Sequence, residues 1–142
     1  SQPKSDFPDS MRENLAKRQL KAEEEEYQEL IKRGEEAVKI SEELAKSFEE
    51  NNKLSNDDQK KLEKLEKVVK RIRRDLGAED EKDEKQENKP STLLNTLNTI
   101  KEKTSSLLSE LKKTSRYSIS VVAVESSNVV FKLVRFLRFN KS

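Results

Sequence analysis

The stretch YSISVVAVESSNVVFKLVRFLRF (residues 117–139) decides which fold the sequence predicts. β-Branched and aromatic residues dominate it, whereas Lys and Glu crowd the rest of the chain. Alternating apolar and polar residues would indicate a strand, but the alternation fails at Val122 and Val124, and there is no second strand with which it could pair. A spacing of three and four residues fits better, so we predict a helix. Its apolar stripe comprises Ile119, Val122, Ser126, Val129, Leu133 and Phe136, with Val130 and Leu137 beside it.

Residues 10–50 predict a long amphipathic helix. Apolar and small residues recur there in steps of three and four among Glu, Lys and Arg. At 1.5 Å per residue the helix would be about 60 Å long, and Asp9 or Ser10 would cap its first turn. Gly34 lies on the stripe, which indicates a close approach of another helix. The stripe comprises Leu20, Tyr27, Leu30, Ile31, Gly34, Ala37, Val38, Ser41, Leu44, Ala45 and Phe48.

Start, stripe and end signals agree on a second helix over residues 56–76. Ser55 and Asp58 match the pattern of a capping box. Gly77 supplies the left-handed residue that commonly ends a helix. The spacing of the stripe is that of a helix–helix seam, with Leu62, Leu65, Val69, Ile72 and Leu76.

Residues 78–91 (AEDEKDEKQENKPS) contain no apolar residue larger than Ala and predict an acidic, solvated linker. A further helix is expected after Pro90, with Ser91 or Thr92 as its cap. The sequence leaves open whether it ends before residues 117–139 or continues through them. The absence of Gly and Pro between the two segments favours one helix. The stripe of the further helix comprises Leu93, Leu97, Ile100, Thr104, Leu107 and Leu111.

These segments together predict an all-α fold, an elongated bundle of three or four helices in a single domain. Residues 1–9 form a flexible tail, residues 10–77 a long antiparallel hairpin, and residues 92–139 a C-terminal helical segment that packs on the hairpin. The chain has 31% apolar and 41% charged residues, which approaches the composition of disordered chains, but its periodicity favours folding. The apolar stretch from Tyr117 is expected to cover the part of the first helix that the second leaves open.

The residue inventory argues against catalysis. The chain contains no His and no Cys, so the usual general bases, thiol nucleophiles and thiolate metal sites are absent. Its two isolated glycines cannot build a phosphate-binding loop. Glu23–Glu26 is interpreted as a solvated face rather than a cation site. We therefore expect no enzymatic activity, no catalytic residue, no metal, no cofactor and no small-molecule substrate.

The C-terminal segment carries the one candidate interaction surface, which is basic and contains phenylalanines. It has the composition of a helix that lies on an anionic membrane or enters a groove of a protein partner. Its charges interrupt it too often for a membrane span. In the alternative interpretation, its apolar residues pack on the first helix while its bases meet the Glu residues there. The candidate surface comprises Phe131, Lys132, Arg135, Arg138, Phe139 and Lys141.

KVVKRIRRDL (residues 67–76) has five basic residues in ten and is a second basic segment. Binding of nucleic acid needs a net basic field, but residues 1–77 hold 18 basic and 19 acidic side chains. Val69, Ile72 and Leu76 also belong to the predicted core stripe. Nucleic acid is therefore a disfavoured partner.

The run RENLAKRQLKAEEEEYQELIKRGEEAVKISEELAKSF, followed by LEKLEKVVKRIRRDLG and SRYSISVVAVESSNVVFKLVRFLR, resembles uncharacterised exported bacterial proteins with a charged helical hairpin. The resemblance covers most of residues 10–139 and implies a helical fold and export, with no activity and no functional residue. The polar, Pro-bearing opening SQPKSDFPDS would also suit an exported, periplasmic protein, although a trimmed cytoplasmic one would begin in the same way.

The function expected from the sequence is that of a non-enzymatic structural or interaction module, which acts through helix surfaces or self-association. A protein partner or a second copy is the expected ligand. The alternative is a peripheral membrane protein that uses the basic C-terminal helix on an anionic surface.

Overall fold

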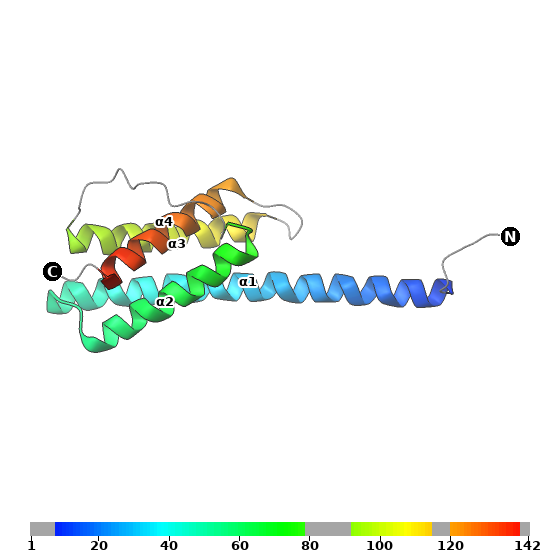
Figure 1. Cartoon of the computed structure of the whole chain (residues 1–142), viewed down its shortest axis with the longest axis horizontal. Helices are drawn as coiled ribbons and strands as arrows, with labels where there is room; N and C mark the ends of the chain where they lie inside the picture. The colour runs from blue at the N-terminus through cyan, green and yellow to red at the C-terminus, as the bar shows by residue number, and fades with distance from the viewer. Residues whose placement is uncertain (1–7, 79–91, 115–119, 140–142) are drawn as a thin grey trace.

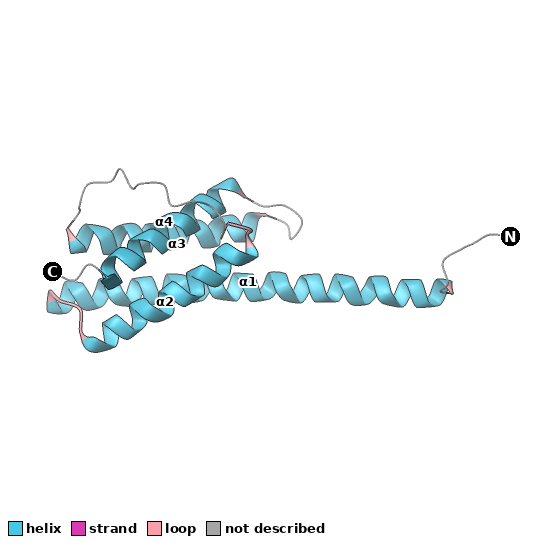
Figure 2. Cartoon of the chain, in the orientation of Figure 1, coloured by secondary structure: helices cyan, strands magenta, loops and turns pink. Residues whose placement is uncertain are grey.

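The computed structural model describes residues 8–78, 92–114 and 120–139, and these residues form four helices. Their bounds are α1 (Asp9–Asn51), α2 (Asn56–Asp75), α3 (Leu93–Lys113) and α4 (Val121–Phe139). No strand occurs within these ranges (Figure 2). The predicted all-α bundle is confirmed, with four helices.

The helices form a four-membered bundle in which each helix has two neighbours. α1 packs against α2 and α3, and α4 packs against the same two helices. Neighbouring helices run antiparallel, and α1 and α4 lie diagonally opposite each other (Figure 1). The predicted hairpin of α1 and α2 is therefore present.

The expected packing of the C-terminal helix on α1 is wrong, because α4 has no contact with α1 in the described residues. The part of α1 that α2 leaves open is rich in charge and offers few apolar side chains. The space between α2 and α3 instead lets α4 bury apolar faces of two helices at once, which stabilises the fold in proportion to the area removed from water. The free half of α1 stays uncovered (Figure 1).

Residues 92–139 form two helices rather than the single one that the sequence favoured. The backbone of Thr114 is extended, with φ −87° and ψ 151°, which ends α3. The Ser120 hydroxyl accepts a hydrogen bond from the Ala123 backbone N–H at the start of α4 (3.2 Å) and donates one to Glu110 of α3 (2.9 Å). The Ser120 hydroxyl therefore caps the start of α4 and links it to α3.

The helix ends confirm most of the predicted signals. Thr92 caps α3 by accepting from the Asn95 backbone N–H, and Gly77 has the left-handed φ of +76° beyond α2. The predicted cap of α1 is wrong, because Pro8 occupies the N-cap position and no side chain caps the helix there. Ala78, which the sequence assigned to the linker, is buried in the bundle. The rest of the predicted linker lies outside the described residues, as do most of the predicted N-terminal tail, Tyr117 and Ile119.

Gly34 lies where α1 packs tightly against α3. A Cβ atom at this position would lie 3.1 Å from Leu108 Cδ1 and 3.2 Å from Leu111 Cδ1. This space is tighter than ordinary side-chain contact, so the interpretation of Gly34 as a site of close helix approach is confirmed. Just beyond, the Tyr27 hydroxyl donates to the Leu111 carbonyl at 2.8 Å, where the cover of α1 by the bundle ends.

The predicted stripe of α2 is buried, as is that of α3 apart from the partly buried Leu93, but the stripe of α4 is rotated from its predicted position. Val122 and Phe136 were expected in the core and are exposed. Apolar residues lie on most faces of α4, so the spacing of apolar residues in its sequence does not single out one buried face. Small side chains face the core instead, where they let α4 approach its neighbours closely. The buried residues of α4 are Ala123, Ser126, Ser127, Val130 and Val134.

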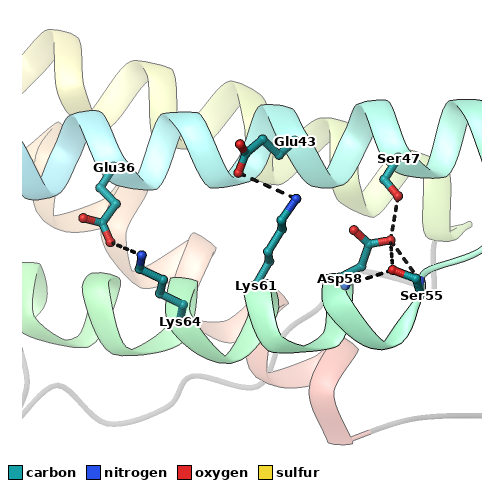
Figure 3. A network of polar contacts seen from close by, with 7 residues as sticks. All are labelled: Glu36, Glu43, Ser47, Ser55, Asp58, Lys61 and Lys64. Atoms are coloured by element: carbon teal, nitrogen blue, oxygen red, sulfur yellow. Dashed lines mark hydrogen bonds and ion pairs between the residues drawn. The ribbon is translucent and has the colours of Figure 1, made fainter.

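The capping box of α2 also ties α2 to α1 (Figure 3). Asp58 Oδ2 accepts from the Ser55 backbone N–H (2.9 Å), from the Ser55 hydroxyl (3.0 Å) and from the Ser47 hydroxyl of α1 (2.6 Å). Burial of the Asp58 carboxyl would raise its pKa, but these hydrogen bonds outweigh burial, so the pKa lies below its ordinary value of 3.8. Farther along the same seam, Figure 3 shows the surface ion pairs Lys61–Glu43 and Lys64–Glu36.

Asp58→Asn should weaken the bundle in a pH-dependent way. The carboxylate contributes fully above its unfolded pKa of about 3.9, and this contribution is lost as the pH falls through the lower folded pKa. We expect the variant to lose about 1–2 kcal/mol of unfolding free energy at neutral pH. The difference from wild type should shrink below about pH 4. Urea unfolding followed by circular dichroism at several pH values measures it.

The matched control is Asp57→Asn, because Asp57 is an exposed acid in the same turn. It should change the unfolding free energy by less than about 0.5 kcal/mol at every pH. A loss for Asp58→Asn that stays constant from neutral to acidic pH would contradict the role assigned to the carboxylate.

Candidate interaction surfaces

Within the described ranges, the acidic side chains do not assemble into a metal site. Among the described residues, no group of three or more Asp and Glu lies close enough together to hold a metal ion. Likewise, none of the four helices is both long and apolar enough to cross a bilayer within the ranges described.

The predicted basic surface on α4 is largely engaged within the molecule. Arg138 Nη1 lies 2.8 Å from Glu66 Oε1, and Arg135 Nη1 lies 3.4 Å from Glu66 Oε2. The expectation that these bases meet Glu residues of the first helix is thus wrong, because Glu66 belongs to α2. Lys132 is half-buried. Lys141 lies outside the described residues.

The two phenylalanines of this surface differ in environment. Phe131 packs against the core, whereas Phe139 is 60% exposed. The guanidinium of Arg138 lies 4.8 Å from the centre of the Phe139 ring, and that of Arg135 lies 5.2 Å from it. These distances allow cation–π attraction. The two arginines thus contact aromatic rings of α4 and the Glu66 carboxylate of α2. The contacts with Glu66 fasten α4 to α2.

Arg73 is a buried cation that the sequence did not single out. Only 6% of the surface of Arg73 is exposed. Its Nε donates to Asn128 Oδ1 at 2.8 Å, its Nη2 donates to the Ala78 carbonyl at 3.3 Å, and its guanidinium lies 4.3 Å from the centre of the Phe131 ring. One of the five bases of residues 67–76 therefore points into the bundle, where it joins α2 to α4.

The N-terminal part of α1 is left uncovered by the other described helices (Figure 1). We call residues 9–26 the arm. It projects beyond the other helices (Figure 1) and is about 27 Å long at 1.5 Å per residue. Hydrogen bonds between exposed side chains one turn apart support it, such as Arg12–Asp9 and Gln19–Glu23. Three large apolar side chains lie on it: Met11 is 46% exposed, Leu15 45% and Leu20 48%.

Charge is segregated along the arm and the turn that follows it. Residues 9–21 hold four basic and two acidic side chains, whereas residues 22–29 hold five acidic side chains and no base. The tip of the arm is therefore net positive and its base net negative. Glu23–Glu26, which the sequence indicates as a solvated face, thus follows directly on a basic segment of the same helix.

A groove lies where the arm meets the end of α2. We call it the elbow groove; it has a volume of about 780 Å³. Both of its arginines lie near one carboxylate, with Arg33 Nη1 2.8 Å from Asp75 Oδ2 and Arg71 Nε 3.8 Å from Asp75 Oδ1. Four Glu residues of α1 give the rest of the wall its negative charge. The lining residues are Ala22, Glu23, Glu25, Glu26, Tyr27, Glu29, Leu30, Arg33, Arg71 and Asp75.

Comparison of the chain with known protein families, with curated protein sequences and with solved structures finds no match. The candidate surfaces are therefore judged by their geometry alone. The sequence pointed to the α4 surface through its composition, and it missed the arm because Leu20 was counted in a stripe that was expected to be covered.

Proposed function

We propose that this protein is a non-enzymatic helical interaction module that binds a protein through the arm of α1. The observation that carries the proposal is a projecting helix with three exposed large apolar side chains, Met11, Leu15 and Leu20. Full burial of such a side chain contributes about 1.5–3 kcal/mol. A partner helix or groove on the face that holds Met11 and Leu15 could gain this energy without any rearrangement of the bundle.

The way in which the arm is held supports a binding role. Short helices without tertiary packing are marginal in water, mainly because the first turn is costly to form. The arm avoids this cost because it continues a helix whose other half is packed in the bundle. It is therefore presented to a partner already folded, which lowers the entropy lost on binding.

The α4 surface is a weaker candidate because its arginines already have partners in the chain. A ligand that competes for Arg138 would have to replace the 2.8 Å contact with Glu66, which has a side chain only 13% exposed. This ion pair is partly buried, so a competing ligand would have to compensate for the lost contact as well as bind. Binding of this surface to an anionic membrane stays a prediction.

Site-specific photo-crosslinking tests the proposal in the cells that naturally make the protein. A photoreactive residue at Leu15 should yield discrete protein adducts, because this position lies on the arm. The same residue at Lys101, which is exposed on α3, serves as the matched control and should yield none. A lack of adducts from Leu15, or the same adducts from both positions, would overturn the proposal.

A further inference from the structure

We propose that the partner of the arm is a second copy of this chain, whose arm lies antiparallel to the first. This inference rests on the proposed function, since it names the protein that the arm binds. In the complex, the basic tip of each arm lies along the acidic base of the other and reaches its elbow groove.

The distribution of charge selects this arrangement. In an antiparallel pair with its two-fold axis near residue 20, residue 12 of one arm lies beside residue 28 of the other, and residue 18 lies beside residue 22. Residues 12–18, which hold three of the four bases of the tip, therefore face residues 22–28, which hold four of the five acids, twice in the same complex. A parallel pair would set like charges side by side along the whole arm, which is unfavourable. The arm is thus complementary to itself in one direction only.

One face of α1 connects the arm to the seam with α2. Residues 11, 15, 18, 22, 26, 29 and 33 follow one another in steps of three and four, so they share a face. The same face continues into Glu36, Glu43 and Ser47, which contact α2. α2 ends near Arg33, and beyond that point the face is uncovered. A second arm on this face would occupy the line along which α2 would continue.

The apolar side chains fit the same arrangement. Met11 and Leu15 lie on this face near the tip, and the elbow groove offers Tyr27 and Leu30 in its lining at the matching distance from the two-fold axis. The tip of the second copy therefore brings its exposed apolar residues to an acidic groove that is partly apolar. Because the two contacts are equivalent, the dimer is closed by two-fold symmetry.

The interface is expected to be small and dominated by charge, at the lower end of the size range of specific complexes. Such an interface weakens with salt. At about 0.5 mM protein, a dimer with a Kd of about 50 µM would contain roughly four-fifths of the chains. Sedimentation equilibrium at low ionic strength should detect this dimer, and the dimer should dissociate as salt is added.

Charge exchange provides the decisive test. One variant carries Arg12→Glu, Arg18→Glu and Lys21→Glu; the other carries Glu25→Lys, Glu26→Lys and Glu29→Lys. All six positions are exposed, so we expect both variants to keep the helicity and thermal stability of the bundle. Each variant alone should be monomeric, because its arms now repel each other. An equal mixture should recover a dimer with one chain of each variant.

The direction of the arms can be measured independently. The chain has no Cys, so Ser10→Cys provides a single site for a spin label. An antiparallel pair centred near residue 20 separates the two labels by about 30 Å along the helix axis, whereas a parallel pair would bring them together. A separation that indicates parallel arms would overturn the inference.

Three further results would overturn it. They are a wild-type chain that stays monomeric up to about 0.5 mM at low salt, variants that associate as wild type does, and a mixture that stays monomeric. The proposed function can survive each of them, because photo-adducts from Leu15 to a different protein would keep the arm as the binding site while excluding the second copy. A loss of all Leu15 adducts together with a monomeric chain would end both proposals.

Discussion

Replacing Leu107 by alanine should lower the free energy of unfolding by about 2–5 kcal/mol. Leu107 has no exposed surface and lies on α3, which packs against both α1 and α4. The substitution removes buried methyl groups and leaves a cavity that two neighbouring helices must close. Because a small domain has only about 5–15 kcal/mol of stability in total, the loss would be a large part of it. Urea unfolding followed by circular dichroism measures the change.

Leu94→Ala is the matched control, because it makes the same substitution on the same helix at a residue that is 39% exposed. It should cost less than about 1 kcal/mol. Equal losses for the two variants would show that the side of α3 placed in the core is wrong, and with it the position of α3 between α1 and α4.

Arg73→Ala should lower the free energy of unfolding by about 2–4 kcal/mol. The substitution removes two hydrogen bonds from a charged donor, to Asn128 and to the Ala78 carbonyl, and the cation–π contact with Phe131. The contacts with Asn128 and Phe131 join α2 to α4, and the contact with Ala78 joins α2 to the residues that follow it. Hydrogen exchange should therefore increase more in α4 than in α1, and urea unfolding should give the total loss.

Two further variants make this prediction specific. Arg73→Lys should recover little of the loss, because one ammonium group cannot donate to both acceptors and also stack on the ring. Arg71→Ala, at an exposed residue of the same helix, should cost less than about 1 kcal/mol. If Arg73→Ala were as stable as Arg71→Ala, the buried cation would not contribute to the α2–α4 contact.

The four helices differ in how well the sequence predicted them. α2 was predicted with its capping box, its stripe and its final Gly77, because each of these signals acts within a few residues. Gly34 was also interpreted correctly, since a residue without a side chain on an apolar stripe allows another helix to approach closely. The sequence alone leaves open whether residues 92–139 form one helix or two, and the contact that links the start of α4 to α3, from Ser120 to Glu110, joins residues of two different helices.

For the candidate surfaces too, the sequence indicates the local features, whereas the contacts between helices come only from the structure. Composition indicates Arg135 and Arg138 as part of a candidate interaction surface, but a single carboxylate of α2, Glu66, engages both. Arg73 was one base among five in its segment, and only the position of α4 makes it a buried contact. The arm was missed because α4 was expected to cover the rest of α1, whereas the structure leaves this part of α1 exposed.

The sequence by itself determined that this chain is helical, where most of its helices begin and end, and that it lacks His and Cys chemistry. These properties follow from periodicity, caps and residue inventory, which are local. Only the tertiary structure decided which helices are neighbours, which face of α4 is buried and which half of α1 remains uncovered. Several of the helices carry similar apolar stripes, so the choice among pairings depends on the total apolar area that all four helices bury together. This area cannot be derived from the sequence of any single helix.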